Sequence, residues 1–201
     1  MSEPLRLAFL GVDNPHGAGW RDLFVHFENA AELAGFYPGF GGAIASLEER
    51  YAQCTRYETV EDLIADGRWD GAVVCLSNQE GPAAIAKLAE ADIPVLCEKP
   101  VAGSAADFAA PAKTLQSNGL AYQNGYMWRY DQAAERLRRM VAEAQFGKLI
   151  SIEMRMTTAD VQRRNPNHYL FDRSVSSAGF LNWLACHQLR KPAELTDRSK
   201  R

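Results

Sequence analysis

This sequence lacks long apolar runs and carries little net charge, the two features that would indicate a membrane or a nucleic-acid partner. None of its apolar stretches approaches the ~20 residues that a membrane-spanning helix needs, so we expect no membrane partner. The net charge is only −3 over 201 residues, which gives no electrostatic reason to expect a nucleic-acid partner. The segment Met1 to Pro4 also lacks the basic, apolar and small-residue order of a secretory signal.

The sequence also lacks the paired cysteines of redox and metal motifs. Its four cysteines are widely separated and form no C-x-x-C pair, and the four histidines show no ligand spacing, so no metal site is predicted. Cys75 and Cys97 fall within apolar runs, where a free cysteine packs as a small hydrophobic residue. This pattern, together with the missing signal, favours a reduced, cytoplasmic location.

Apolar runs alternate with helical patterns through the first 126 residues, and an apolar fraction of 47% is sufficient for a large core. The predicted strands are 5–10, 32–37, 71–77, 95–97 and 120–126. The predicted helices are 18–28, 43–54, 59–65, 82–91 and 104–117. This alternation predicts an α/β fold, a Rossmann-like doubly wound parallel sheet.

The pattern changes beyond residue 126. Residues 131–144 form an amphipathic helical pattern, residues 149–157 alternate as a half-buried antiparallel strand does, residues 160–177 indicate a polar loop, and residues 178–189 indicate an apolar helix. We therefore predict two domains, a dinucleotide-binding domain over 1–123 and an incomplete α/β domain with a mixed or antiparallel sheet over 124–201.

The turn after the first strand matches the dinucleotide pattern G-x-G-x-x-G only in part. Gly11 fits the first position, but Asp13 replaces the second glycine, His16 replaces the third, and Gly17 comes one residue late. An aspartate at the second position adds bulk and negative charge where backbone must approach a pyrophosphate. The second strand also ends without the acid that usually holds a ribose hydroxyl, so the choice between NAD and NADP is not predicted.

The residues Glu98-Lys99-Pro100 follow a short apolar strand directly. Charged side chains at the end of a buried strand are costly unless they are paired, and in an open α/β sheet ligands bind beyond the carboxyl ends of the strands. Spacing alone leaves two interpretations equally open: an aimed, functional lysine, or an ordinary Glu-Lys pair that ends a strand.

With these pieces in place, the chain resembles the glucose–fructose oxidoreductase / inositol dehydrogenase (Gfo/Idh/MocA-like) family of NAD(P)-dependent oxidoreductases. The resemblance runs from about Leu5 to His187. Its markers are Glu98-Lys99-Pro100, the run VVCLSN before it, YMWRY at 126–130, FGKLI at 146–150, and Ala178-Gly179 followed by His187.

The resemblance implies hydride transfer between NAD or NADP and a sugar- or cyclitol-like alcohol, in a protein that forms homo-oligomers. It implies catalytic roles for Lys99, which binds the reacting hydroxyl and moves its proton, and for His187, its acid–base partner. Without the resemblance, His187 would be interpreted as an ordinary core histidine. The residues predicted to line the cofactor site are Gly11, Asp13, His16, Gly17, Ser77, Asn78, Glu98, Lys99 and Arg129.

Several positions depart from the family pattern. Trp183 stands where an aspartate often precedes the histidine, Arg190 where a second aspartate is common, and Gly81 where a histidine is often found. Members are much longer than this chain, so we expect a C-terminally truncated product whose polar tail does not continue the helical pattern.

Two further hypotheses therefore remain beside the oxidoreductase. One is a nucleotide- or ligand-binding protein on the same scaffold with catalysis reduced or lost. The other is a Rossmann-like domain that binds another small molecule and no nucleotide.

Overall fold

The structure, a computed structural model, describes residues 3–14, 17–41, 52–159, 162, 165–179 and 181–187. Contacts between residues divide the chain into two compact units, Met1–Gly125 and Tyr126–Arg201. Each unit is described separately below.

The first unit contains a six-stranded sheet in the order β3-β2-β1-β4-β5-β6, in which all paired neighbours are parallel. The strands are β1 (Leu5–Leu10), β2 (Ala31–Tyr37), β3 (Thr55–Arg56), β4 (Gly71–Val74), β5 (Val95–Cys97) and β6 (Tyr122–Asn124). The strand order reverses between β1 and β4, the point at which doubly wound sheets bind their ligands. The predicted α/β, doubly wound parallel fold is confirmed.

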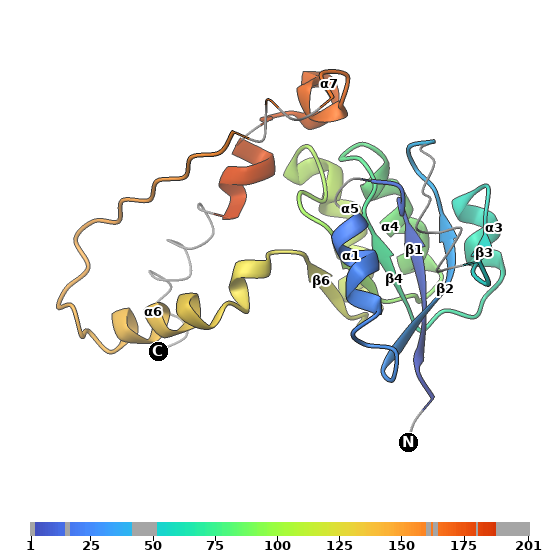
Figure 1. The fold of residues 1–201 in the computed structure, drawn as a ribbon, viewed down its shortest axis with the longest axis horizontal. Coiled ribbons are helices and arrows are strands. Elements are labelled where there is room, and N and C mark those ends of the chain that lie inside the picture. Colours follow the sequence, from blue (N-terminus) through green and yellow to red (C-terminus); the bar gives the residue numbers. More distant parts are fainter. Residues whose placement is uncertain are drawn as a thin grey trace. The chain divides into compact units, whose positions relative to one another are not determined.

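Helices cover both faces of this sheet (Figure 1). They are α1 (Gly17–Phe24), α3 (Val60–Ala65), α4 (Glu80–Glu90) and α5 (Ala105–Ser117). Because successive strand residues point to opposite faces, Ala8 and Leu10 of β1 pack with α3, α4 and α5, whereas Phe9 between them packs with Trp20 and Phe24 of α1. Buried apolar residues on both faces hold the strand ends in fixed positions.

Two helices begin at the capping residues that the sequence predicts. The Thr59 hydroxyl accepts a hydrogen bond from the Asp62 backbone N–H at the start of α3. Ser104 and Asp107 form a reciprocal capping box at the start of α5. Each cap satisfies backbone donors that the first turn of a helix leaves without a partner.

Several predicted boundaries differ from the structure. Helix α1 ends at Phe24 rather than at residue 28, because the chain turns through hydrogen bonds such as Ala30 N to Phe27 O at 2.7 Å. Two strands are shorter than predicted. The strand predicted over 71–77 is β4, which ends at Val74, and the strand predicted over 120–126 is β6, which begins only at Tyr122. The two-residue strand β3 was not predicted, and most of the helix predicted over 43–54 lies outside the described residues.

The second unit contains η1 (Met127–Arg129), α6 (Gln132–Ala142), η3 (Tyr169–Phe171), α7 (Arg173–Ser176) and the π-helical turn η4 (Leu181–Ala185). The predicted strand over 149–157 is wrong for the described residues: this stretch has no strand partner among them, and Ile150 is 92% exposed. A strand forms only when a neighbour accepts its backbone hydrogen bonds. The loop predicted over 160–177 contains η3 and α7, and the helix predicted over 178–189 is described as helical only from 181 to 187.

We predict that Ile85→Ala destabilises the first unit strongly. Ile85 lies on α4 and is fully buried in the core cluster, so truncation removes packed apolar surface and leaves a cavity that costs about 2–5 kcal/mol. The measurement is the free energy of unfolding from urea denaturation. Ile150→Ala is the matched control, and because its side chain is exposed we expect a change within about 0.5 kcal/mol. Equal effects of the two variants would contradict the assignment of the core.

Candidate cofactor and active site

The turn after β1 is held by backbone contacts on both sides. The Gly11 N–H donates to the Tyr37 carbonyl at 2.8 Å, at the end of β2, and the Cys75 N–H donates to the Leu10 carbonyl at 2.8 Å, at the end of β4. A Cβ atom on Gly11 would lie 2.6 Å from the Cys75 carbonyl oxygen, and the φ angle of Gly11 is +75°. Only glycine fits this close approach in this conformation.

A buried amide fastens the same turn to β4. The side chain of Asn14 is 2% exposed, and its Nδ2 donates to the Cys75 carbonyl oxygen at 2.6 Å. The chain then enters α1, with the Gly17 N–H donating to the Asn14 carbonyl at 2.7 Å. Asn14 was not predicted as a site residue, because nothing in the sequence indicates which carbonyl it contacts. His16 was predicted here and lies outside the described residues.

Asp13 points to β2. Its Oδ1 accepts a hydrogen bond from the Gly39 N–H at 2.7 Å, and its Oδ2 accepts one from the Phe40 N–H at 2.8 Å. The sequence indicated that this carboxylate would obstruct a pyrophosphate at the turn. In the structure, two backbone donors beyond the end of β2 hold this carboxylate.

The loop after β4 contains two buried polar residues. Ser77 accepts a hydrogen bond from the Glu80 N–H at 3.2 Å and donates to Glu80 Oε2 at 2.7 Å, so its hydroxyl orders the first turn of α4. Asn78 is 2% exposed, and its amide nitrogen and oxygen are both buried without a hydrogen-bond partner. Such a group is costly to leave unsatisfied. A polar ligand at the carboxyl end of β4 would supply what Asn78 lacks.

Glu98 and Lys99 follow β5; Lys99 is buried and Glu98 is mostly buried. The side chains of Glu98 and Lys99 are 13% and 4% exposed, and Lys99 Nζ lies 4.0 Å from Glu98 Oε1. Trp20 of α1 donates from Nε1 to Glu98 Oε2 at 2.7 Å. Trp20 was missed at the sequence level, since it is 78 residues away from Glu98 in the chain. The acid thus joins α1 to the strand end that carries the lysine.

Burial raises the pKa of the Glu98 carboxyl above its ordinary value, although the Trp20 hydrogen bond and the charge of Lys99 act to lower it. Burial also raises the pKa of both the Cys75 and the Cys97 thiol. A buried thiol with a raised pKa is a poor nucleophile, because the thiolate is the reactive form. Glu98 and Lys99 are titratable groups at the carboxyl ends of the strands.

The remaining predicted residues belong to the second unit. His187 is 8% exposed, and its ring stacks on Trp128 with centroids 5.7 Å apart and meets Tyr126 edge-on at 6.0 Å. Trp183, which stands in the place of the family aspartate, is buried at 6% exposure. Arg129 lies in η1 and is exposed. The second unit thus holds its histidine between two aromatic rings.

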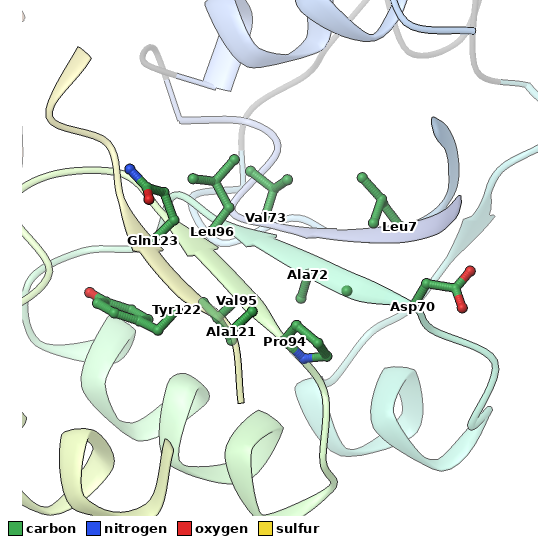
Figure 2. Close-up of a pocket in the computed structure, with 11 residues that line it drawn as sticks. Leu7, Asp70, Ala72, Val73, Pro94, Val95, Leu96, Ala121, Tyr122 and Gln123 are labelled. Carbon is green, nitrogen blue, oxygen red and sulfur yellow. The ribbon is translucent and has the colours of Figure 1, made fainter. Parts of the chain in front are cut away.

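A hollow of about 320 Å³ lies against the sheet near the amino ends of β4 and β5. Figure 2 shows Leu7, Val73 and Leu96 pointing to the same side of the sheet, and the lining also includes Asp70 and Pro94, which precede β4 and β5. Ligands of open α/β sheets bind at the opposite, carboxyl edge. Asp70 is the acidic group of this lining, and its carboxylate accepts the Arg6 N–H at 2.7 Å. The lining of the hollow is therefore mostly apolar, and its acidic group is already hydrogen-bonded to the backbone.

Two absences concern the described residues alone. Within them, no helix combines the length and the apolar character that crossing a membrane requires. No group of three histidine, cysteine, aspartate or glutamate side chains suited to a metal ion occurs in the same part of the chain.

The strand order 3-2-1-4-5-6 and the glycine turn at its switch point define a dinucleotide-binding fold of the Rossmann type. Residues 6–126 match the model of the oxidoreductase family with an NAD-binding Rossmann fold. The chain belongs to this family, the glucose–fructose oxidoreductase / inositol dehydrogenase family that its motifs resemble. The predicted cofactor, NAD or NADP, is confirmed at the level of the family.

Individual relatives are distant. The chain is 27% identical over 147 residues to inositol 2-dehydrogenase of Salmonella typhimurium, covering 72% of this chain and 44% of that enzyme. It is 30% identical over 118 residues to D-xylose 1-dehydrogenase (NADP(+)) 2 of Haloferax volcanii, covering 55% of this chain and 36% of that enzyme. An NAD-binding protein from Listeria innocua matches the fold with a TM-score of 0.70 at 18% identity, covering 98% of this chain and 56% of that chain. The matched part thus spans less than half of each of the two curated relatives.

We predict that Glu98→Gln stabilises the protein at neutral pH and that the gain disappears in acid. Because the folded-state pKa of Glu98 is raised, the folded protein keeps a proton that the unfolded chain releases near pH ~4.3. The stability linked to that proton is present below the unfolded pKa and is lost as the pH rises through the folded pKa. Glutamine does not ionise, so its advantage in Tm should grow as the pH rises above the unfolded pKa of about 4.3 and through the raised folded pKa.

The control for this titration is Glu61→Gln, an exposed acid on α3 that pairs with Lys87 and whose carboxyl pKa is lowered. Its effect on Tm should be small and of the opposite sign, because an exposed ion pair is screened by water. A wild-type Tm that rises relative to Glu98→Gln between acid and neutral pH would show that burial does not dominate at Glu98.

Proposed function

We propose that this chain is the nucleotide-binding part of an oxidoreductase that transfers a hydride between NAD(P) and a sugar- or cyclitol-like alcohol. The observation that carries the proposal is the buried lysine at the carboxyl end of β5, beside a mostly buried glutamate, in a sheet of the NAD-binding oxidoreductase family. The relatives named for inositol and D-xylose support a polyhydroxylated substrate.

Features of the first unit fit a dinucleotide. The turn at Gly11 packs its backbone closely against the end of β4, and α1 begins at Gly17, where helix N–H groups favour phosphate. The buried amide of Asn78 lies in the loop after the neighbouring strand β4 and offers both a donor and an acceptor. These residues would hold the cofactor, whose nicotinamide ring supplies the hydride acceptor or donor.

Lys99 is assigned the proton-transfer role. Its Nζ lies 4.0 Å from Glu98 Oε1 and would bind the substrate hydroxyl. As the neutral amine it would take the hydroxyl proton when the alcohol is oxidised, and as the resulting ammonium it would return that proton on reduction. Glu98 is a positioning residue, because its second oxygen is engaged by Trp20. His187 is assigned the acid–base role that the family resemblance implies, with Tyr126 and Trp128 fixing the plane of its ring.

A second candidate function is nucleotide or ligand binding with catalysis reduced or lost. Buried Trp183 and Gly81 favour it, because they replace an acid and a histidine that support the family's site. A base without its orienting carboxylate is weaker. Binding and turnover therefore have to be measured separately.

We expect saturable binding of NADH or NADPH, detected as energy transfer from tryptophan to the nicotinamide. Gly11→Ala should weaken it by roughly tenfold or more, because the added Cβ would overlap the Cys75 carbonyl and displace the turn. Gly119→Ala is the matched control, since its φ is also positive (+65°) but its Cβ would meet open space. No response of the wild type to either nucleotide at millimolar concentration would end the proposal.

Turnover, assayed with a panel of sugars and polyols, should fall by roughly 10²–10⁴-fold in Lys99→Ala, the range expected for loss of a general acid–base group. The affinity for the nucleotide should change little. Lys87→Ala, which removes an exposed lysine from α4, should retain activity, and His187→Asn should lower kcat if the histidine acts on the proton. Full turnover by Lys99→Ala would exclude the lysine, and binding without any wild-type turnover would favour the second candidate.

A further inference from the structure

The contact between Asp13 and the end of β2 bears on which nucleotide is bound. Both carboxylate oxygens accept backbone hydrogen bonds, from Gly39 and from Phe40, the second and third residues after β2. Charge-assisted bonds of this kind are short and strong. A side chain from the turn after β1 therefore places its negative charge beyond the carboxyl end of the neighbouring strand.

That location has a known role in dinucleotide-binding sheets. The ribose of the adenosine half lies beyond β2, where an aspartate or glutamate accepts its 2′-hydroxyl in NAD-binding units and an arginine accommodates the 2′-phosphate of NADP. In this chain, residues 36–42 read FYPGFGG and contain neither an acid nor a base. Within the part of the chain that the structure describes, the fold brings the carboxylate of Asp13 to this position.

The packing of the two loops keeps the carboxylate there. A Cβ atom on Gly39 would lie 2.5 Å from Leu76 Cδ2 and 3.4 Å from Gly11 Cα, so the loop after β2 packs closely on the loops after β1 and β4. The Gly11 N–H also donates to the Tyr37 carbonyl at 2.8 Å, two residues before Gly39. The contacts between the loops after β1 and β2 therefore hold the Asp13 side chain in one position.

We propose that Asp13 makes this protein prefer NAD(H) to NADP(H), an inference that rests on the proposed function. An ionised carboxylate only accepts hydrogen bonds, so it suits a ribose 2′-hydroxyl, which can donate one. A 2′-phosphate brings about −1.5 to −2 charges next to it and is repelled.

Two arginines among the described residues act against this preference. One is Arg21 of α1, whose guanidinium donates to the Val12 carbonyl next to Asp13. The other is Arg56 of β3, which lies beside Phe36 of β2. The Arg56 Nε is 3.0 Å from Glu58 Oε1, so an acid already partly neutralises its charge. The relatives do not decide the matter, since one carries NADP(+) in its name and one solved structure is called NAD-binding. The Asp13 carboxylate, held at the ribose end of β2, favours the nucleotide without the phosphate.

The test is calorimetric titration of the full chain with NADH and with NADPH. We expect the wild type to bind NADH at least about tenfold more tightly than NADPH. In Asp13→Asn, the ratio of the two dissociation constants should fall to about threefold or less, mainly because NADPH binds more tightly. Glu90→Gln makes the same change of charge at an exposed position on α4 and should leave the ratio unchanged. Thermal unfolding of each variant establishes that it is folded.

A second arm needs no variant. Raising the salt from about 0.02 M to about 0.5 M should narrow the wild-type ratio, because screening weakens the repulsion of the 2′-phosphate. NADPH binding as tightly as NADH in the wild type, or a ratio unchanged in folded Asp13→Asn, would overturn the inference while leaving the proposed function in place. Failure of both nucleotides to bind would overturn the proposed function and this inference together.

Discussion

The close approach of backbone to backbone at Gly11 is the constraint on which the carboxyl edge of the sheet depends. This residue lies between the end of β2, through its hydrogen bond to Tyr37, and the end of β4, where a Cβ would overlap the Cys75 carbonyl. Asn14 then ties the turn to the same carbonyl. Three strand ends meet within a few ångströms because no side chain separates them, and the groups that could bind a ligand are arranged around that meeting point.

The mostly buried glutamate after β5 illustrates how such an edge tolerates charge. Desolvation opposes the ionised form of Glu98, as its raised pKa shows, yet Trp20 and Lys99 supply a hydrogen bond and an opposite charge. An apolar residue would cost less at this position, since a buried ion pair often contributes little net stability. Strained or costly groups that persist in a fold concentrate at functional sites. This cost supports a chemical role for the pair and weighs against the interpretation of an ordinary strand end.

The sequence predicted the features that local physics controls. The strand 5–10, the strand 95–97, the capping box at Ser104 and the helix that it begins agree with the structure, because they depend on apolar runs and on residues within one helical turn. The sequence did not predict contacts between distant residues. It missed the hydrogen bond between Trp20 and Glu98. It also missed the two-residue strand β3, which is a strand because it pairs with β2. The alternating pattern over 149–157 predicted a strand. Periodicity describes a single segment, however, and a β-ladder requires a second strand to pair with it.

Asp13 shows why a motif is an incomplete description of a site. At the level of the sequence, the chain departs from the dinucleotide pattern twice, with an acid in place of the second glycine and with no acid after the second strand. The hydrogen bonds to Gly39 and Phe40 connect these departures, because the acid in the first loop lies where the second loop lacks one. A carboxylate acts through its position in space, and the strand from which it comes is secondary. Both departures from the motif therefore involve one carboxylate, which the backbone after β2 holds.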